Sequence, residues 1–362
     1  MEKRLSISLE ILSILMFFLS IGFYFQSIIN AMKNYSVTQG MGLDLIILIY
    51  SIVLVLVVLL LVLALVFITR YQKKHKLFSC TTYMIGSIKK HKIISSISIL
   101  LTLIIISLLL VINLQDSFIY YPSYSQGAEN ILKELDEYSK VEIESDNGVK
   151  YSGWLKMKDP NAYTIIYFGG NAQSSAMFFS QQNSDDWESF NDYNFVMIDY
   201  PGYGLSDGKP SELGIYEMSL TVFDYVMSLS EIDNSKIIVL GYSLGTGVAT
   251  YVAQNRDFYE LILIAPFTSM IDVFNTKLPL FYGPLTSLFN NKFDSLDRAS
   301  EINEKTLIIY SLDDEVINSN LSAKFADEVI DSTIVVLDNI HHNDFFYQEL
   351  VLSEIDSFIN HD

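Results

Sequence analysis

The stretch that decides the fold is Ile237-Ile-Val-Leu-Gly-Tyr-Ser-Leu-Gly245, where an apolar run leads into a serine flanked by glycines. Chemistry at a serine hydroxyl needs a very tight strand-to-helix turn, and glycines two residues before and after the serine permit that backbone. The pattern is short and also arises by chance, but here a helical pattern follows over residues 244–254. We therefore predict that Ser243 is a nucleophile; the alternative is a structural serine at a glycine-rich helix start.

Outward from this motif, short apolar runs alternate with helical patterns. Continuous apolar runs suit strands that are buried on both faces of a parallel sheet. A pair of alternating runs around an Asp146-Asn147-Gly148 turn predicts two exposed-edge strands. We expect an α/β fold with a mostly parallel sheet flanked by helices over residues 117–362, with its chemistry in loops at the strand C-termini. The expected strands are 141–145, 149–157, 163–168, 195–200, 237–242, 261–265, 306–310 and 333–337, and the expected helices are 212–229, 244–254, 320–329 and 344–359.

A serine nucleophile requires a base and an acid that orients it. The histidine pair after the last apolar run lies where the base must be if the chain order is serine, acid, histidine, whereas His361 is the penultimate residue. The acid is expected in the loop after residues 306–310. Position along the fold leaves the candidates open between His341 and His342 for the base, and between Asp313, Asp314 and Glu315 for the acid.

A glycine-rich turn, Gly169-Gly170-Asn171-Ala172, follows the run at 163–168. Such a turn can direct a backbone N–H at a developing oxyanion, together with the N–H of Leu244. We expect an oxyanion hole here; an ordinary loop is the alternative.

Taken together, these motifs resemble the membrane-anchored Bem46-type α/β-hydrolases, a group that includes the ABHD-like proteins and overlaps the S33 serine-aminopeptidase-like domain. The resemblance covers roughly residue 118 to the C-terminus. The matching stretches are Phe118-Ile-Tyr-Tyr-Pro122, Phe168-Gly-Gly-Asn-Ala172, Asp199-Tyr-Pro-Gly-Tyr-Gly204, Ser206-Asp-Gly208, Gly241-Tyr-Ser-Leu-Gly245, Ala265-Pro-Phe-Thr-Ser269, Lys292-Phe-Asp-Ser-Leu296, Asp314-Glu-Val316 and His342-Asn-Asp344.

The resemblance implies a role for each matching residue. Ser243 corresponds to the nucleophile, Asp314 to the triad acid, His342 to the base, and Asn171 and Leu244 to the backbone oxyanion donors. The sequence departs from the family pattern in two loops. A glycine, at position 169, stands where histidine is common, and Tyr-Ser stands at 310–311 where His-Gly is common. These departures concern loop geometry and so leave the substrate preference open.

The first 116 residues are of a different kind. Three stretches, 11–32, 45–69 and 93–115, contain no charged residue and are 22, 25 and 23 residues long. About 20 apolar residues are needed to cross a bilayer as a helix. We predict a membrane domain over 1–116 with three transmembrane helices; the alternatives are buried core helices and, for the first stretch, a cleaved signal peptide. The family usually has one membrane anchor or none, so three spans go beyond its pattern.

Charge predicts the orientation of this membrane domain. The loop 70–92 carries seven Lys/Arg and no acid, and short basic loops stay in the cytoplasm. The hydrolase domain of this multi-pass integral membrane protein is then expected on the non-cytoplasmic face. Alternatively, the basic loop is only a lipid-binding patch.

Composition also excludes several partners. Residues 1–116 carry a net charge of +6 and residues 117–362 one of −25, which together give the −19 of the chain. So acidic a domain repels nucleic acid, and we predict no nucleic-acid partner. The single cysteine, Cys80, cannot form a disulfide within the chain. No histidine lies in a metal-ligand pattern, so neither a metal nor a cofactor is predicted.

The predicted activity is serine hydrolysis of a carboxylic ester or thioester through an acyl-serine intermediate. The apolar segment 267–293 is either a short cap over an acyl pocket or an ordinary excursion packed on the sheet. We expect the membrane lipid bilayer as a partner and a lipid or acyl ester as substrate. The alternatives are a serine peptidase or aminopeptidase and a non-catalytic membrane protein built on a hydrolase fold.

Overall fold

A computed structural model describes residues 119–361 apart from 185–189, 278 and 280, together with 115–117 and isolated positions at 102, 109, 112 and 113. The three predicted membrane spans and Cys80 therefore lie outside the described residues, except for a few positions of the third span. Within the described part of the chain, no helix has the length and the apolar character that are needed to cross a membrane.

Eight strands of the described region form one sheet in the order β1-β2-β4-β3-β5-β6-β7-β8. The six strands β3 to β8 pair with one another in parallel, whereas β2 is antiparallel to both β1 and β4. This is the predicted α/β architecture with a mostly parallel sheet. The strands are β1 Tyr138–Glu144, β2 Lys150–Lys156, β3 Thr164–Phe168, β4 Asn194–Ile198, β5 Ile237–Tyr242, β6 Glu260–Ile264, β7 Lys305–Ser311 and β8 Ser332–Leu337.

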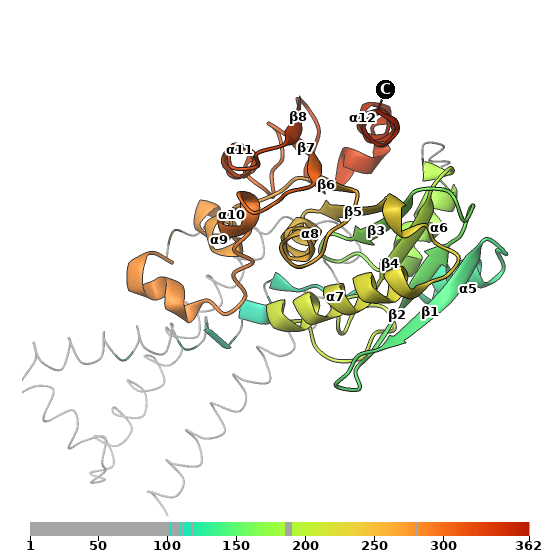
Figure 1. The fold of residues 1–362 in the computed structure, drawn as a ribbon. Coiled ribbons are helices and arrows are strands. Elements are labelled where there is room, and N and C mark those ends of the chain that lie inside the picture. Colours follow the sequence, from blue (N-terminus) through green and yellow to red (C-terminus); the bar gives the residue numbers. More distant parts are fainter. Residues whose placement is uncertain are drawn as a thin grey trace, which may run out of the picture. The chain divides into compact units, whose positions relative to one another are not determined.

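Helices cover both faces of this sheet. Figure 1 shows α7, α8 and α11 on one side and α6 and α12 on the other. The helices are α5 Gln126–Lys133, α6 Ser175–Ser184, α7 Glu212–Ser228, α8 Leu244–Asn255, α9 Met270–Lys277, α10 Leu296–Ala299, α11 Ser319–Ala326 and α12 Glu349–Asn360. Three short 3₁₀ helices lie in the connections of the described region: η2 Asn234–Lys236, η3 Gly283–Leu288 and η4 His342–Tyr347.

The core lies along the central strands. Every residue of β3, β4, β5 and β6 is buried, as expected for apolar, largely branched strands packed between two layers of helices. Because the central strands are parallel, all their carboxyl ends open at one edge of the sheet, and the loops after β3, β4, β5, β7 and β8 meet there.

Three sequence predictions about individual elements are wrong. The strand at 149–157 was expected to be an exposed edge, but β2 lies between β1 and β4, and six of its seven residues are buried. The strand at 333–337 was expected to be buried on both faces, but β8 is the edge strand, and Ile334 and Val336 are exposed. The helix expected at 344–359 is interrupted at Gln348, where η4 ends and α12 begins.

The apolar segment 267–293 forms α9 and η3. It has a small core of its own, in which the rings of Phe274, Phe281 and Phe289 pack edge to face with centroids 5.0–6.4 Å apart. Figure 1 shows this segment, in orange, projecting beyond α10 rather than lying along the sheet. We refer to residues 270–291 as the excursion.

Candidate active site

Ser243 occupies the turn between β5 and α8 with φ 53° and ψ −119°. A non-glycine residue is rarely found in this region of backbone space, and holding one there costs about 1–3 kcal/mol. The flanking glycines make the turn geometrically feasible. A methyl group at position 245 would lie 1.9 Å from the carbonyl oxygen of Phe168, and one at position 241 would lie 2.5 Å from the carbonyl oxygen of Gly245. The turn thus presents the hydroxyl of Ser243 at the carboxyl edge of the sheet.

His342, at the start of η4, lies directly against that hydroxyl. Its Nε2 is 2.8 Å from Ser243 Oγ, and its Nδ1 is 2.7 Å from Asp314 Oδ2. All three side chains are buried. An ionised carboxylate can only accept, so Nδ1 carries the proton in this arrangement, and Nε2 is left to accept a proton from the serine.

The acid is fixed by its own loop. Asp314 Oδ1 accepts hydrogen bonds from the backbone N–H groups of Val316 and Ile317, both at 2.8 Å. This leaves Oδ2 facing the imidazole of His342. The short loop after β7 therefore helps to set the direction of the carboxylate.

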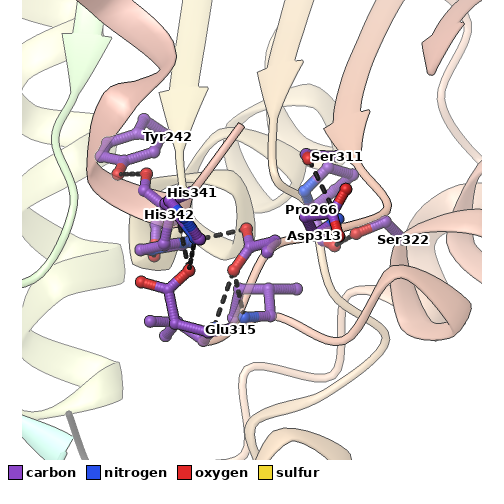
Figure 2. A network of polar contacts seen from close by, with 12 residues as sticks. Tyr242, Pro266, Ser311, Asp313, Glu315, Ser322, His341 and His342 are labelled. Carbon is purple, nitrogen blue, oxygen red and sulfur yellow. Dashed lines mark hydrogen bonds and ion pairs between the residues drawn. The ribbon is translucent and has the colours of Figure 1, made fainter. Parts of the chain in front are cut away.

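The neighbouring candidates have other contacts (Figure 2). Asp313 Oδ2 accepts the backbone N–H of Asn339 at 2.8 Å and so joins the loops that follow β7 and β8. Glu315 Oε2 accepts the backbone N–H of His342 at 3.2 Å and lies 3.3 Å from Nδ1 of the exposed His341. The geometry thus brings Asp314 and His342, rather than Asp313 and His341, to the serine.

Tyr242 holds the other side of the imidazole, a contact that the sequence did not indicate. Its hydroxyl donates to the carbonyl oxygen of His342, and its ring stacks on the imidazole with centroids 5.4 Å apart and an interplanar angle of 27°. Burial raises the pKa of Tyr242 far above its ordinary value, so the hydroxyl keeps the proton that it donates. Tyr242, which directly precedes Ser243, therefore also supports the side chain and backbone of His342.

The 169–172 loop passes beside Ser243. A methyl group on Gly170 would lie 3.6 Å from the Cβ of Ser243. Leu244 is the first residue of α8, so its N–H has no acceptor within the helix, and the positive end of the helix dipole lies at the same place. Among the described residues, neither Asn171 N–H nor Leu244 N–H donates to a protein acceptor. Both N–H groups were predicted from the sequence as oxyanion donors, and both remain available for an external acceptor.

The side chain of Asn171 connects three other residues by hydrogen bonds, which the sequence analysis did not predict. Its Nδ2 donates to the carbonyl oxygen of Ile119, and its Oδ1 accepts from the Tyr121 N–H at 3.0 Å and from the Tyr203 hydroxyl at 2.7 Å. The Tyr200 hydroxyl adds a 2.7 Å hydrogen bond to the carbonyl oxygen of Gly169. The loop is thereby tied to two remote segments, 119–121 and 200–203. The only sequence signal was the run of tyrosines and glycines after β4.

Asp199 supports the turn that carries these tyrosines. Its Oδ1 accepts the Ser175 N–H at 2.6 Å, and a methyl group on Gly204 would lie 1.8 Å from its Oδ2. Burial raises the pKa of this carboxyl to about 6, partly offset by hydrogen bonds from Ser175 and Leu205. The turn after β4 is thus built tightly around a buried acid.

The geometry supplies the parts of a nucleophilic site. It has a serine hydroxyl at the carboxyl edge of the sheet, a base and an oriented carboxylate, and two N–H groups that donate to no protein acceptor among the described residues. Within the described residues, no group of three or more His, Cys, Asp or Glu side chains is placed to hold a metal ion.

Comparison with known proteins agrees with this fold. Residues 163–284 match the family model described as the alpha/beta hydrolase fold. The protein bem46 of Schizosaccharomyces pombe is 30% identical over 221 residues, which are 56% of this chain and 71% of that protein. The lysophosphatidylserine lipase ABHD12 of Xenopus tropicalis is 32% identical over 177 residues, which are 44% of this chain and 45% of that protein.

Solved structures show the same architecture. The esterase Pf2001 of Pyrococcus furiosus superposes with a TM-score of 0.53 at 18% identity, covering 67% of this chain and 98% of that one. At this identity the likeness concerns the fold alone. The predicted resemblance to Bem46-type proteins is confirmed at the level of the family, whose similarity runs through the serine turn and the strands around it. The chain therefore belongs to the α/β-hydrolase fold family.

Proposed function

We propose that the chain is a serine hydrolase that cleaves carboxylic esters or thioesters. The observation that carries this proposal is the continuous hydrogen-bonded path from Ser243 Oγ through His342 to Asp314, with distances of 2.8 and 2.7 Å. Groups within 2.6–3.2 Å can pass a proton without large rearrangement.

The reaction has two halves. His342 Nε2 takes the proton from Ser243 as its oxygen attacks the carbonyl carbon, and the N–H groups of Asn171 and Leu244 stabilise the oxyanion. The tetrahedral intermediate expels the alcohol or thiol, which receives the proton from His342, and leaves an acyl-serine. Water, deprotonated by His342, then attacks the acyl group, releases the acid and restores the serine hydroxyl. Asp314 stays ionised and stabilises the imidazolium in both halves.

A lipid or other long-chain acyl ester is the substrate class that we favour. The relative from Xenopus tropicalis is named a lysophosphatidylserine lipase, and the apolar excursion follows β6 at the edge of the sheet where Ser243 lies. The test is a panel of p-nitrophenyl esters of rising chain length, run beside aminopeptidase substrates. We expect ester hydrolysis that increases with chain length. Cleavage of the peptide substrates alone would favour the serine peptidase alternative.

Labelling by a fluorophosphonate separates both enzymes from a non-catalytic protein built on the same fold. The free N–H groups and the base beside Ser243 support an active enzyme, because a non-catalytic protein would not require this arrangement. We expect covalent labelling of the unaltered chain. Absence of labelling, together with absence of turnover on both substrate classes, would overturn the proposal.

We also propose that the chain is anchored in a membrane by the three charge-free stretches at 11–32, 45–69 and 93–115, with the hydrolase domain on the non-cytoplasmic face. In intact cells that carry the protein on the plasma membrane, a membrane-impermeant maleimide should leave Cys80 unlabelled until the cells are permeabilised. Ser123, just past the third stretch, is buried, so the reporter is the neighbouring exposed position. A cysteine introduced by Tyr124→Cys, in a Cys80→Ser background, should label in intact cells if the hydrolase domain lies outside. Labelling of Cys80 without permeabilisation would invert the orientation.

A further inference from the structure

Three exposed apolar side chains lie on elements at the carboxyl edge of the sheet. Tyr282 and Leu285, at the start of η3, are 60% and 39% exposed, and Leu213, in the first turn of α7, is 80% exposed. We call these three residues the tether face, because hydrogen bonds tie the elements that carry them to residues 115 and 116.

Hydrogen bonds fix the end of the excursion to Gln115, the last residue of the third charge-free stretch. Gln115 Nε2 donates to the carbonyl oxygen of Leu288 at 3.3 Å, and Gln115 Oε1 accepts the N–H of Asn290 at 2.8 Å. The buried Gln115 side chain thus joins η3 to the point where the chain enters the hydrolase domain.

Asn291 extends this connection to the start of α7. Its Nδ2 donates to Asp116 Oδ1 at 2.7 Å, while its Oδ1 accepts the Tyr120 hydroxyl at 3.0 Å and the Glu212 N–H at 2.9 Å. In Figure 1 the teal segment just before Tyr120 lies beside the first turn of α7. The residues bearing the tether face are therefore held at a fixed place around 115–120.

Charge distinguishes this place from the rest of the domain. Residues 117–362 carry a net charge of −25, yet residues 281–291 include no charged side chain. The carboxylate of Asp116 accepts from Asn291, and that of Glu212 accepts the N–H groups of Lys292 and Phe293 at 2.7 and 2.9 Å. Because an acidic surface is repelled by anionic headgroups, a neutral face is the one that can approach a bilayer.

We propose that the tether face lies in the interface of a lipid bilayer. Gln115 ends a stretch of the sequence, 93–115, that is long enough to span the hydrocarbon. A tyrosine beside leucines suits the headgroup boundary, where aromatic rings are enriched. This contact would turn the excursion toward the lipid, so that acyl substrates reach Ser243 from the bilayer. The contact rests on the proposed membrane anchoring, and this last consequence rests also on the proposed hydrolase activity.

The contact itself is tested without turnover. In a Cys80→Ser background, a fluorophore is attached through Leu285→Cys, and the chain is placed in phosphatidylcholine vesicles. Ile330→Cys gives the matched control. Ile330 is 83% exposed and lies just before β8, at the amino ends of the parallel strands and so away from the carboxyl edge. We expect nitroxide-labelled lipid to quench the label at 285 and aqueous iodide to quench the label at 330. Iodide quenching at both positions without lipid quenching would overturn the proposal. So would cross-linking of two copies through position 285, which would assign the face to a dimer.

A kinetic test follows the consequence for substrate. Leu285→Glu should raise the apparent KM for an ester carried in vesicles by roughly 10-fold, because an interfacial carboxylate opposes insertion. The same variant should leave hydrolysis of a water-soluble short-chain ester unchanged, and Ile330→Glu should change neither. Equal effects of Leu285→Glu on both substrates would contradict lipid-side access. If the unaltered chain turned over neither ester, the proposed function would fail, while the quenching result would still decide the face.

Discussion

The two halves of the candidate site are built in different ways. The acid is positioned mainly by its own loop, since Asp314 Oδ1 accepts the N–H groups of Val316 and Ile317. The base begins η4 and is held in addition by Tyr242. The 169–172 loop depends on groups 32 and 52 residues away, the Tyr203 hydroxyl and the Ile119 carbonyl. Local support should fail one residue at a time, whereas remote support should fail together when any member is removed.

The largest expected effect on activity is at Ser243, which both halves of the site contact. Ser243→Ala removes the attacking oxygen and should lower ester turnover by about 10⁴-fold or more, with little change in melting temperature. Ser228→Ala, on the exposed end of α7, is the control. A Ser243→Ala variant that hydrolyses esters at the unaltered rate would remove Ser243 from the mechanism.

The acid–base half should respond strongly but selectively. We expect His342→Gln and Asp314→Asn each to lower kcat/KM by about 10³–10⁴-fold, because the proton has no acceptor or the imidazole no fixed tautomer. The neighbours provide matched controls, and His341→Gln and Asp313→Asn should cost less than about 10-fold. If either pair exchanged its behaviour, the residue assignment would be wrong although the mechanism would stand.

The serine turn links both halves, and its close packing is testable through stability. Gly245→Ala would place a methyl group 1.9 Å from the Phe168 carbonyl oxygen, so the free energy of unfolding should fall by about 3 kcal/mol. Gly127→Ala is the control, because a methyl group there lies 3.8 Å from its nearest neighbour in α5, and it should be neutral or stabilising by up to about 1 kcal/mol. Equal losses in denaturant titrations of the two variants would show that the turn is not tightly packed.

The remote half should show coupled, intermediate effects. Tyr203→Phe and Asn171→Ala each detach the 169–172 loop, and we expect kcat to fall by about 10–100-fold with KM nearly unchanged, as for a weakened oxyanion contact. The double variant should be no worse than the Asn171→Ala variant. Tyr259→Phe, at an exposed site, serves as the control. Fully additive losses, or a rise in KM alone, would contradict the shared anchoring role.

The smallest effect is the pH dependence of the turn around Asp199. Its pKa of about 6 in the folded chain exceeds the unfolded value near 4, so the folded chain retains a proton between these pH values that the unfolded chain has lost. Stability should therefore fall as the pH rises from about 4 to 6, by at most about 1.4 kcal/mol per pH unit. Asp199→Asn removes this contribution. Unfolding curves of the two chains that run parallel across this window would exclude it.

Much of the fold could be predicted from the sequence, since each strand expected from an apolar run is present within a few residues. The failures have physical causes. Helix α6 was missed because Phe178 and Phe179 are both buried at adjacent positions, which obscures the helical period. The exposure of β8 depends on its place at the sheet edge, which composition alone does not reveal.

The candidate site, like the fold, could be predicted from the sequence only in part. The serine, the acid and the base occur in chain order in the loops after β5, β7 and β8, so motif and position could locate these loops. The choice of Asp314 and His342 within them came from the family resemblance. The hydrogen bonds of Asn171 with Ile119 and Tyr203 join segments that only the folded chain brings together. The stacking of Tyr242 on His342 likewise joins residues 100 positions apart. Local patterns carry no information on such contacts.

The central claim is that Ser243 becomes acylated during turnover. Its most direct test is rapid acid quenching of the chain with a slowly hydrolysed p-nitrophenyl ester, followed by peptide mass spectrometry. The account predicts a burst of p-nitrophenol that approaches one equivalent, and an added acyl mass on the peptide that contains Ser243. A burst with the acyl group on another residue, or steady turnover without any acylated peptide under conditions where deacylation is slow, would contradict it.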